Sequence, residues 1–358
     1  MKLDIFQYDE NTKKLVNDFL FAKNIGKYIL GTNLTALNLS NLVHINAFIN
    51  DFTENKTFNK LLLIHSDFAK KDSIIVSASL SIYAYSAVCS LREKGFEKII
   101  TIPDIINYST LAVNTFLSDA QKDIELNYEQ YVCIYQRLND ELSKKIFKNL
   151  LNFRKNGAIS YLSSFSVDPI GQYFEEFLNL QENEVFVDAG AYDGQTSVEF
   201  IKKCPKYKSI YLFEPSDENL TLAKENLKKF SNVNFISKGL SNQKDTLRFD
   251  TDSGSASSIS ENGTVEIDVD TLDALVNEKV TFIKMDIEGA ESFAIEGMKN
   301  HILNDYPKMA ISVYHKVDDL WKIPEQILAI RDDYDLYIRH YTEGTDETVM
   351  FFIPKFVD

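Results

Sequence analysis

The fold is decided by one stretch of ten residues, Val187-Asp188-Ala189-Gly190-Ala191-Tyr192-Asp193-Gly194-Gln195-Thr196. The apolar run that leads into it ends in an acid, and glycines follow two and six residues after that acid. A segment with helical spacing, Thr196 to Lys203, begins directly behind them. A parallel strand turns into a helix in this way where a small polar ligand lies across the turn. We therefore predict a cofactor site that includes Asp188, Gly190, Tyr192, Asp193, Gly194 and Thr196.

The spacing of the glycines discriminates between cofactors. A dinucleotide site needs Gly-x-Gly-x-x-Gly, so that the backbone can approach a pyrophosphate. In this chain Tyr192 takes the place of the second glycine, and no third glycine falls in register. The pattern therefore favours a ligand that has no phosphates and carries an ammonium and a sulfonium group, which is S-adenosylmethionine.

A second acid supports the same site. Ile210-Tyr211-Leu212-Phe213 is another apolar run, and it ends in Glu214-Pro215. A carboxylate at the tip of the second strand, roughly 20–25 residues after the glycine turn, can accept both ribose hydroxyls of an adenosine. We therefore add Glu214 and Pro215 to the predicted cofactor site. Two alternatives stay open: NAD, whose ribose Glu214 would bind equally well, and an ordinary strand–helix–strand unit with an exposed acid.

The two halves of the chain differ in charge. A length of 358 residues suggests about two domains, and 44% hydrophobic with 25% charged residues is typical of a soluble globular protein. Residues 1–165 hold 19 basic and 17 acidic residues, whereas the remainder holds 19 basic and 36 acidic ones. The acidic half carries the glycine turn and would repel a polyanion, so we predict no nucleic-acid partner.

Neither the cysteines nor the apolar segments indicate export or a membrane. The three cysteines, at positions 89, 133 and 204, have no metal or redox spacing, as is usual in a reducing cytoplasm. Residues 73–91 carry no charge, but six of these 19 residues are serines, which favours a buried strand and helix over a membrane span. The N-terminus has no signal pattern. We predict a cytoplasmic protein without a membrane span.

The first 165 residues are predicted to form an α/β domain of their own. Strands at 73–79 and 98–103 flank a helix at 81–94. The turn of this unit has no glycine, so it cannot cradle a phosphate. We interpret 1–165 as a degenerate nucleotide-fold domain for dimerisation or acceptor binding, and 166–358 as the cofactor-binding domain. A homodimer stays open.

Strands and helices alternate from residue 184 onward, which predicts a mostly parallel sheet covered on both faces. The expected strands are 184–188, 208–213, 232–237, 280–286, 308–313, 334–340 and 347–353. The expected helices are 194–203, 216–230, 289–298 and 322–331. The turn before the last strand is too short for a crossover helix, so the final pair should be antiparallel. Between the third and fourth strands we expect a serine-rich polar loop, Phe249–Asp268.

A second group of polar residues, Phe282-Ile283-Lys284-Met285-Asp286-Ile287-Glu288-Gly289-Ala290-Glu291, is expected beside the first. If the first strand is central, the fourth lies next to it at the topological switch point, where ligands bind outside the carboxyl ends of the strands. Asp286 and Glu288 would then face the cofactor crevice. Glu291 is explained as an acid that favours the N-terminus of a helix.

Two further strands end in polar residues. The fifth strand delivers Tyr314 and His315, and a histidine at the carboxyl end of a strand suits proton chemistry. The sixth strand ends near Arg339, whose guanidinium suits a carboxylate or a phosphate. A packed surface arginine is the alternative for Arg339.

Together these segments resemble the FkbM-type family of S-adenosylmethionine-dependent methyltransferases over about Asn139 to Pro354. The resemblance is carried by several blocks in the same order: Arg137–Ser143, Gln172–Phe174, Asp188–Gly194, Phe213–Pro215, Val269–Asp273, Lys284–Glu291, Ser312–Lys316, Asp318–Trp321, Arg339–Tyr341 and Glu347–Val349. The family implies the class I methyltransferase fold, a Rossmann-like sheet of seven strands whose last strand is antiparallel. It also implies O-methylation, commonly of a sugar hydroxyl in a surface polysaccharide, a glycolipid or a natural product.

The chemistry assigns roles to these residues. The attacking hydroxyl must lie in line with the methyl–sulfur bond and lose its proton. We assign His315 as the general base, Asp286 as a residue that orients His315 or the substrate and also borders the cofactor, and Glu288 as a neighbour. An alternative is a divalent ion held by Asp286, Glu288 and His315. The expected acceptor is a sugar hydroxyl of a surface glycan, a glycolipid or a nucleotide-sugar precursor, bound by Tyr173, Lys284, Tyr314 and Arg339.

Two other classes of function stay open. An NAD-linked sugar oxidoreductase would need pyrophosphate recognition, which Tyr192 and Asp193 disfavour. A non-catalytic scaffold with the methyltransferase fold would be expected to lose Asp188, Glu214 and Asp286 together, and all three are present.

Overall fold

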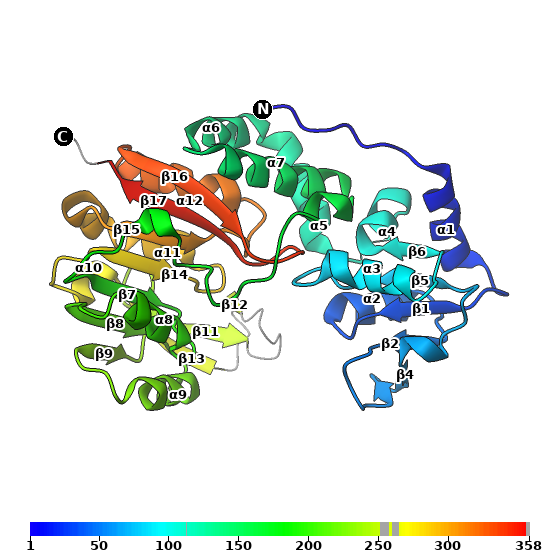
Figure 1. Ribbon diagram of the computed structural model, residues 1–358, viewed down its shortest axis with the longest axis horizontal. Coiled ribbons are helices and arrows are strands. Elements are labelled where there is room, and N and C mark those ends of the chain that lie inside the picture. The colour runs from blue at the N-terminus through cyan, green and yellow to red at the C-terminus, as the bar shows by residue number, and fades with distance from the viewer. Residues whose placement is uncertain (112, 251–257, 260–264, 356–358) are drawn as a thin grey trace. The chain divides into compact units, whose positions relative to one another are not determined.

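The computed structural model describes residues 1–111, 113–250, 258–259 and 265–355. The chain divides into two compact units (Figure 1). The first unit comprises 1–129, 145–167 and 341–346, and the second comprises 130–144, 168–340 and the C-terminal segment from 347. Among the described helices, none combines the length and the apolar character that crossing a bilayer requires.

The first unit is built on a six-stranded sheet with the order β3-β4-β2-β1-β5-β6. All neighbours pair in parallel except β3, which is antiparallel to β4. Its strands are β1 (Lys27–Leu30), β2 (Ala47–Ile49), β3 (Thr57–Phe58), β4 (Leu61–Ile64), β5 (Ile74–Ser77) and β6 (Ile99–Thr101). Its helices are α1 (Glu10–Phe21), α2 (Leu34–Leu42), α3 (Ala84–Glu93), α4 (Ile102–Tyr108) and α5 (Thr115–Leu126), with short 3-10 turns at Ser66–Phe68 and Ile159–Leu162. The predicted strand–helix–strand unit is β5-α3-β6.

The N-terminus of α3 is occupied by a carboxylate from the far end of the chain. Glu343 accepts hydrogen bonds from the backbone N–H and the hydroxyl of Ser86, both at 2.8 Å. Glu343 lies in the segment 341–346, which belongs to the first unit. In a nucleotide-binding fold this position suits a phosphate, because the helix N-terminus presents unpaired N–H groups. Here a side chain of the protein itself fills it.

The second unit contains a seven-stranded sheet with the order β16-β17-β15-β14-β7-β8-β9. Its strands are β7 (Val185–Ala189), β8 (Ser209–Phe213), β9 (Val233–Ile236), β14 (Phe282–Met285), β15 (Lys308–Ser312), β16 (Tyr334–His340) and β17 (Thr348–Pro354). Only β17 runs antiparallel to its two neighbours, β15 and β16. The predicted α/β architecture with an antiparallel last strand is therefore present, with β7 and β14 adjacent at its centre.

Burial explains why these central strands have almost no polar residues. All five residues of β7 and all four of β14 are buried, as expected for a parallel strand covered on both faces. Phe186 of β7 stacks on Phe200 and Phe282, with ring centroids 4.2 and 5.0 Å apart. The flanking helices are α8 (Gln195–Lys203), α9 (Asp217–Leu227), α10 (Leu272–Leu275), α11 (Glu291–Glu296) and α12 (Asp319–Ile330), with a π-turn at His301–Asp305 and a 3-10 turn at Glu176–Leu178. This core fixes the two strand ends that carry the polar groups.

A second sheet of four strands was not predicted. It has the order β10-β13-β11-β12, formed by β10 (Gly239–Leu240), β11 (Asp245–Asp250), β12 (Ser258–Ile259) and β13 (Val265–Asp270). The expected loop at 249–268 is therefore wrong where β11, β12 and β13 enter it, because β11 and β13 pair antiparallel over five residues each. Residues 251–257 and 260–264 of that expected loop lie outside the described residues.

Helices α6 (Tyr128–Arg137) and α7 (Glu141–Asn156) are both divided between the units. In the second unit, the break between them packs on β16: the N–H of Asn139 donates to the carbonyl of Leu336 at 2.8 Å. Segment 130–144 is thus part of the second unit although it lies ahead of residue 166 in the sequence.

Candidate functional site

The glycine turn after β7 has the backbone geometry that its sequence demands. Gly190 and Gly194 have φ values of +74° and +80°, in the left-handed region that favours glycine. A Cβ on Gly190 would lie 1.8 Å from the carbonyl oxygen of Asp286, so no other residue fits there. Tyr192, with φ +51°, holds the same unusual conformation with an exposed side chain. The turn therefore brings the backbone of β7 directly against the end of β14.

Glu214 pins this turn to the end of β8. Its Oε2 accepts the N–H of Tyr192 and its Oε1 accepts the N–H of Ser216, both at 2.9 Å. Burial raises the pKa of Glu214, and these two N–H groups act against that rise. The side chain of Asn219 is a third hydrogen-bond partner of this carboxylate, which has about four acceptor positions. Glu214, which was predicted to bind the cofactor, thus also stabilises the glycine turn.

Asp188 lies beneath the turn. Its side chain is completely buried, with Oδ2 accepting the hydroxyl of Ser197 at 2.7 Å and Oδ1 3.3 Å from the ammonium of Lys284. Lys284 in turn donates to the carbonyl of Gly190 at 2.7 Å. The geometry makes Asp188 and Lys284 a buried ion pair that supports the turn from below, so their predicted contacts with cofactor and acceptor stay predictions.

Other predicted cofactor residues surround the same turn. Asp193 Oδ1 accepts the N–H of Gln195 at 3.1 Å, and the carbonyl of Asp193 accepts the amide of Asn226. Thr196 follows in the first turn of α8, and Pro215 follows Glu214; both are partly exposed. The structure therefore gathers the predicted cofactor residues around the ends of β7 and β8.

Asp286 is the centre of a polar cluster at the end of β14. The Tyr173 hydroxyl donates to Asp286 Oδ2 at 2.6 Å, and the Tyr314 hydroxyl lies 3.4 Å from both carboxylate oxygens. Burial and the charge of Asp286 raise the pKa of both tyrosines, so both stay protonated donors. The predicted acceptor residues Tyr173 and Tyr314 are therefore brought together by one carboxylate.

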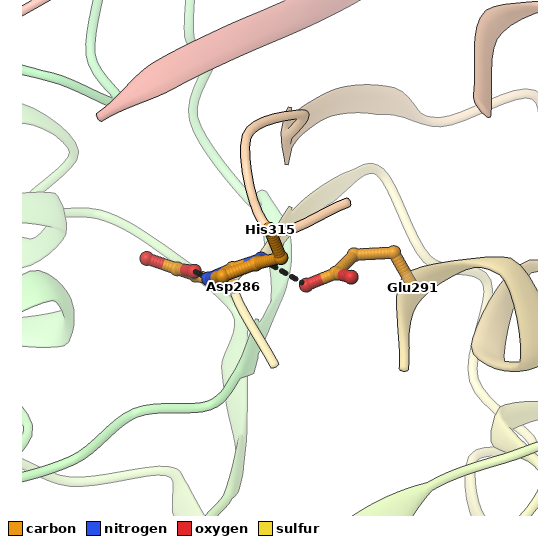
Figure 2. Close-up of side chains that lie close together, drawn as sticks. All are labelled: Asp286, Glu291 and His315. Carbon is orange, nitrogen blue, oxygen red and sulfur yellow. Dashed lines mark ion pairs between the residues drawn. The ribbon is translucent and has the colours of Figure 1, made fainter. Parts of the chain in front are cut away.

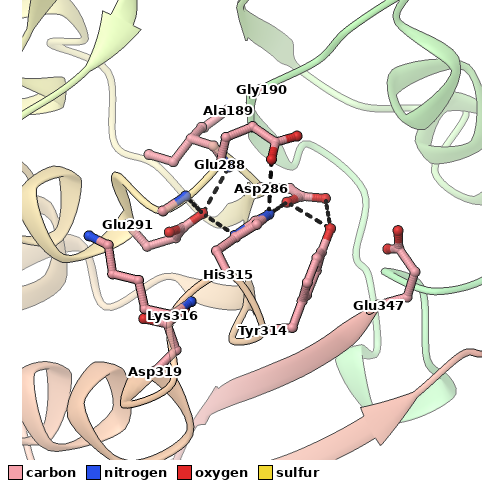
Figure 3. Close-up of polar contacts among 12 residues, drawn as sticks. Ala189, Gly190, Asp286, Glu288, Glu291, Tyr314, His315, Lys316, Asp319 and Glu347 are labelled. Carbon is pink, nitrogen blue, oxygen red and sulfur yellow. Dashed lines mark hydrogen bonds and ion pairs between the residues drawn. The ribbon is translucent and has the colours of Figure 1, made fainter. Parts of the chain in front are cut away.

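His315 lies between carboxylates on opposite sides of its ring (Figure 2). Its Nδ1 is 3.0 Å from Glu291 Oε1, and its Nε2 is 3.3 Å from Asp286 Oδ1. Glu288 Oε2 lies 3.5 Å from the same Nε2 (Figure 3). Glu291 is itself fixed, because it is buried and its Oε1 accepts the N–H of Ile287 at 2.9 Å. The ring is therefore oriented by Glu291 and presents Nε2 to the side where Asp286 and Glu288 lie.

The charges of this cluster shift its pKa values. Burial alone would lower the pKa of His315, but the ion pair with Glu291 and the charges of Asp286 and Glu288 outweigh it and raise the pKa to about 10. Burial raises the pKa of Glu288 to about 7, with His315 acting against that rise. Asp319, buried beside Lys316, also has its pKa raised to about 7 by burial. Glu288 thus titrates near neutral pH, whereas His315 holds its proton.

Glu291 is the residue that sequence reasoning missed. It was explained as a helix-favouring acid, and it does begin α11, but its carboxylate contacts His315. Among the described residues, Asp286, Glu291 and His315 form a group that could hold a metal ion. This group contains Glu291 where the predicted metal site had Glu288. One ligand atom from each of these three residues lies within 4.8 Å of the other two.

Arg339 is engaged by protein groups. Its Nη2 donates to Asp140 Oδ2 at 2.7 Å, and its Nη1 donates to the hydroxyl of Ser143 and the carbonyl of Ile338, both at 2.9 Å. These contacts hold segment 130–144 to β16. Arg339 is therefore packed against protein groups, as the alternative interpretation expected. Its role in acceptor binding stays a prediction.

With this geometry in place, comparisons with known proteins identify the class. The fold is that of an α/β protein of the methyltransferase-like kind: a solved structure of a methyltransferase FkbM from Methylobacillus flagellatus KT superposes with a TM-score of 0.79 at 23% identity, over 97% of this chain and 94% of that one. Residues 188–341 match the family described as the methyltransferase FkbM domain. The resemblance to the FkbM-type family is confirmed.

More distant structures add no argument. A precorrin-6y C5,15-methyltransferase from Geobacter metallireducens GS-15 has a TM-score of 0.33 at 18% identity, over 49% of this chain and 82% of that one. Fibrillarin from Aeropyrum pernix, solved with natively bound S-adenosyl-L-methionine, has a TM-score of 0.32 at 12% identity, over 48% of this chain and 67% of that one. No curated protein matches the chain in sequence.

Proposed function

We propose that the protein is an S-adenosylmethionine-dependent O-methyltransferase that acts on a sugar hydroxyl of a glycan, a glycolipid or a sugar precursor. The observation that carries the proposal is the placement of His315. Its ring is oriented by Glu291, and its Nε2 faces Asp286 and Glu288 beside the glycine turn of β7.

The residues around the turn fit this cofactor. Glu214 keeps an acceptor position for the ribose after binding two backbone N–H groups and the side chain of Asn219. Tyr192, in place of a glycine, disfavours the close approach that a pyrophosphate needs. S-adenosylmethionine supplies an electrophilic methyl group when bound. The acidic residues around His315 suit the cationic groups of S-adenosylmethionine. They do not suit the anionic pyrophosphate of NAD.

The proton of the attacking hydroxyl passes to a group at the end of β14 or β15. We assign this role to His315, with Glu291 holding the ring and Asp286 orienting the ring or the acceptor. A second cation beside His315 disfavours its charged form, so the pKa of about 10 should fall when the sulfonium binds. Glu288, with a pKa raised to about 7, is the second candidate base. In the first unit, Glu343 fills the anion position of α3, which supports a role in dimerisation or acceptor binding over a second cofactor site.

Calorimetry tests the cofactor directly. The full chain should bind S-adenosylmethionine and its demethylated product, and should not bind NAD under the same conditions. Mass spectrometry of the glycans of the producing cell, with and without the gene, then tests the acceptor. Tight binding of NAD without binding of S-adenosylmethionine would replace the proposal with the oxidoreductase alternative.

A further inference from the structure

Glu347 brings another carboxylate to the Asp286 side of the polar cluster. It lies immediately before β17, and its side chain lies near Tyr314 in Figure 3. Burial contributes most to the raised pKa of Tyr314, and the charges of Asp286 and Glu347 follow. Glu347 also contributes to the raised pKa of Glu288. Asp286, Glu288 and Glu347 therefore lie close enough for their charges to affect the same neighbouring groups.

The side chain of Gln172 provides a second, independent sign of a ligand. Its Nε2 donates to Glu347 Oε2 at 2.8 Å, which fixes the amide because only its nitrogen can donate to a carboxylate. The other amide atom, Oε1, is buried and has no hydrogen-bond partner among the described residues, and the residue is only 5% exposed. A buried acceptor of this kind calls for a donor.

The donors of the cluster are already committed. The hydroxyls of Tyr173 and Tyr314 face Asp286, and the protonated Nε2 of His315 faces Asp286 and Glu288. The ammonium of Lys284 lies below, against Asp188 and the carbonyl of Gly190. What faces a ligand here is a set of acceptors: the carboxylates of Asp286, Glu288 and Glu347, and the amide oxygen of Gln172. A ligand must therefore bring the hydrogen-bond donors itself.

We propose that Glu347 and Gln172 form an acceptor subsite that selects an amino group, and less strongly a hydroxyl, next to the hydroxyl that is methylated. This inference rests on the proposed function and names its substrate class, an amino sugar. An ammonium forms charge-assisted hydrogen bonds with carboxylates. A phosphate or carboxylate at the same position meets the like charge of Glu347 and an amide oxygen of Gln172 that can only accept, so a sugar phosphorylated there is rejected.

Binding to the full chain saturated with S-adenosylhomocysteine tests the subsite without turnover. The probes are D-glucosamine, D-glucose and D-glucose 6-phosphate, titrated by ligand-observed NMR. We expect glucosamine to bind at least tenfold more tightly than glucose 6-phosphate, with glucose between them. Glu347→Gln keeps the shape, removes the charge and should lower glucosamine affinity about tenfold or more. Glu325→Gln, at an exposed acid of α12, is the matched control and should leave all three affinities unchanged.

Two outcomes overturn the subsite: no saturable glucosamine binding by tens of millimolar, or equal affinity for glucosamine and glucose 6-phosphate. A Glu347→Gln variant with unchanged glucosamine affinity does so as well. Affinity for S-adenosylhomocysteine, measured in each variant, reports that the fold and the cofactor site are intact. If the parent chain does not bind S-adenosylhomocysteine, the proposed function itself fails. If it binds S-adenosylhomocysteine but the subsite is overturned, only the assignment of the acceptor fails.

Discussion

His315 is the single residue on which the proposed chemistry depends most. Replacement by glutamine removes the proton acceptor but keeps a polar side chain among Asp286, Glu288 and Glu291. Turnover should fall by about 10²–10⁴, the usual contribution of a positioned general base. Affinity for S-adenosylmethionine should stay nearly unchanged in calorimetry. His44→Gln, which changes an exposed histidine of the first unit, is the control.

The pH profile separates the two candidate bases. In the parent enzyme the rate should rise with pH as the base loses its proton, near 7 for Glu288 or toward 10 for His315. The His315→Gln variant should lack the more alkaline rise. If this variant keeps most of its activity and a chelator has no effect, His315 is neither the base nor a metal ligand.

Glu214 is expected to act on both cofactor and backbone. Glu214→Ala removes the acceptor for ribose hydroxyls and leaves the N–H groups of Tyr192 and Ser216 without their partner. At about 1.5–3 kcal/mol for each hydrogen bond to a charged group, affinity for S-adenosylmethionine should fall at least a hundredfold. Calorimetry measures this fall, and Glu218→Ala, an exposed acid on α9, is the control. Unchanged affinity would remove Glu214 from the cofactor site.

At the scale of elements, the junction between β7 and α8 depends on Gly190. An alanine there forces a left-handed φ on a residue with a Cβ and drives that Cβ into the carbonyl of Asp286. We expect the free energy of unfolding to drop by roughly 2–5 kcal/mol, from backbone strain and overpacking together. Gly95→Ala is a matched control, because Gly95 has φ +83° but open space around its Cβ position. It should lose only roughly 1–2 kcal/mol. Equal losses in urea unfolding would show that the close approach does not matter.

Periodicity predicts those elements that bury continuous apolar runs. β7, β8, β14 and β15 fall within about two residues of their expected bounds because parallel strands covered on both faces leave an unbroken apolar signal. The four-stranded sheet was missed although β13 alternates: Ile267 and Val269 are buried and Glu266 and Asp268 are exposed. We expected this alternating segment to be part of a polar loop rather than a strand.

Long-range contacts are what the sequence does not predict. Glu291 begins α11 and fits a helix terminus, and nothing local shows that it meets His315, which follows 24 residues later. Arg339 likewise pairs with Asp140, almost 200 residues away. Residue type indicates that an acid or an arginine needs a partner, whereas only the tertiary fold decides which one.

At the scale of the whole molecule, the charge state of His315 contributes to stability. Its pKa is about 10 in the folded protein against 6.5 for the ordinary group, so the folded state binds the proton more tightly. This contribution is fully present below pH 6.5 and is lost as pH rises through 10. We expect the free energy of unfolding to decline from about pH 7 to 10, and to decline less in His315→Gln. Parallel declines in both proteins, measured by urea unfolding, would contradict the raised pKa.

The turn 341–346 has a consequence for the order in which the protein is made. It belongs to the first unit, where Glu343 binds the N-terminus of α3, yet Glu343 follows Ser86 of that helix by 257 residues. During synthesis the other parts of the first unit leave the ribosome long before this turn. Helix α3 therefore lacks its contact with Glu343 until the chain has emerged as far as this turn. Completion of the first unit is thus tied to the arrival of the β16–β17 hairpin.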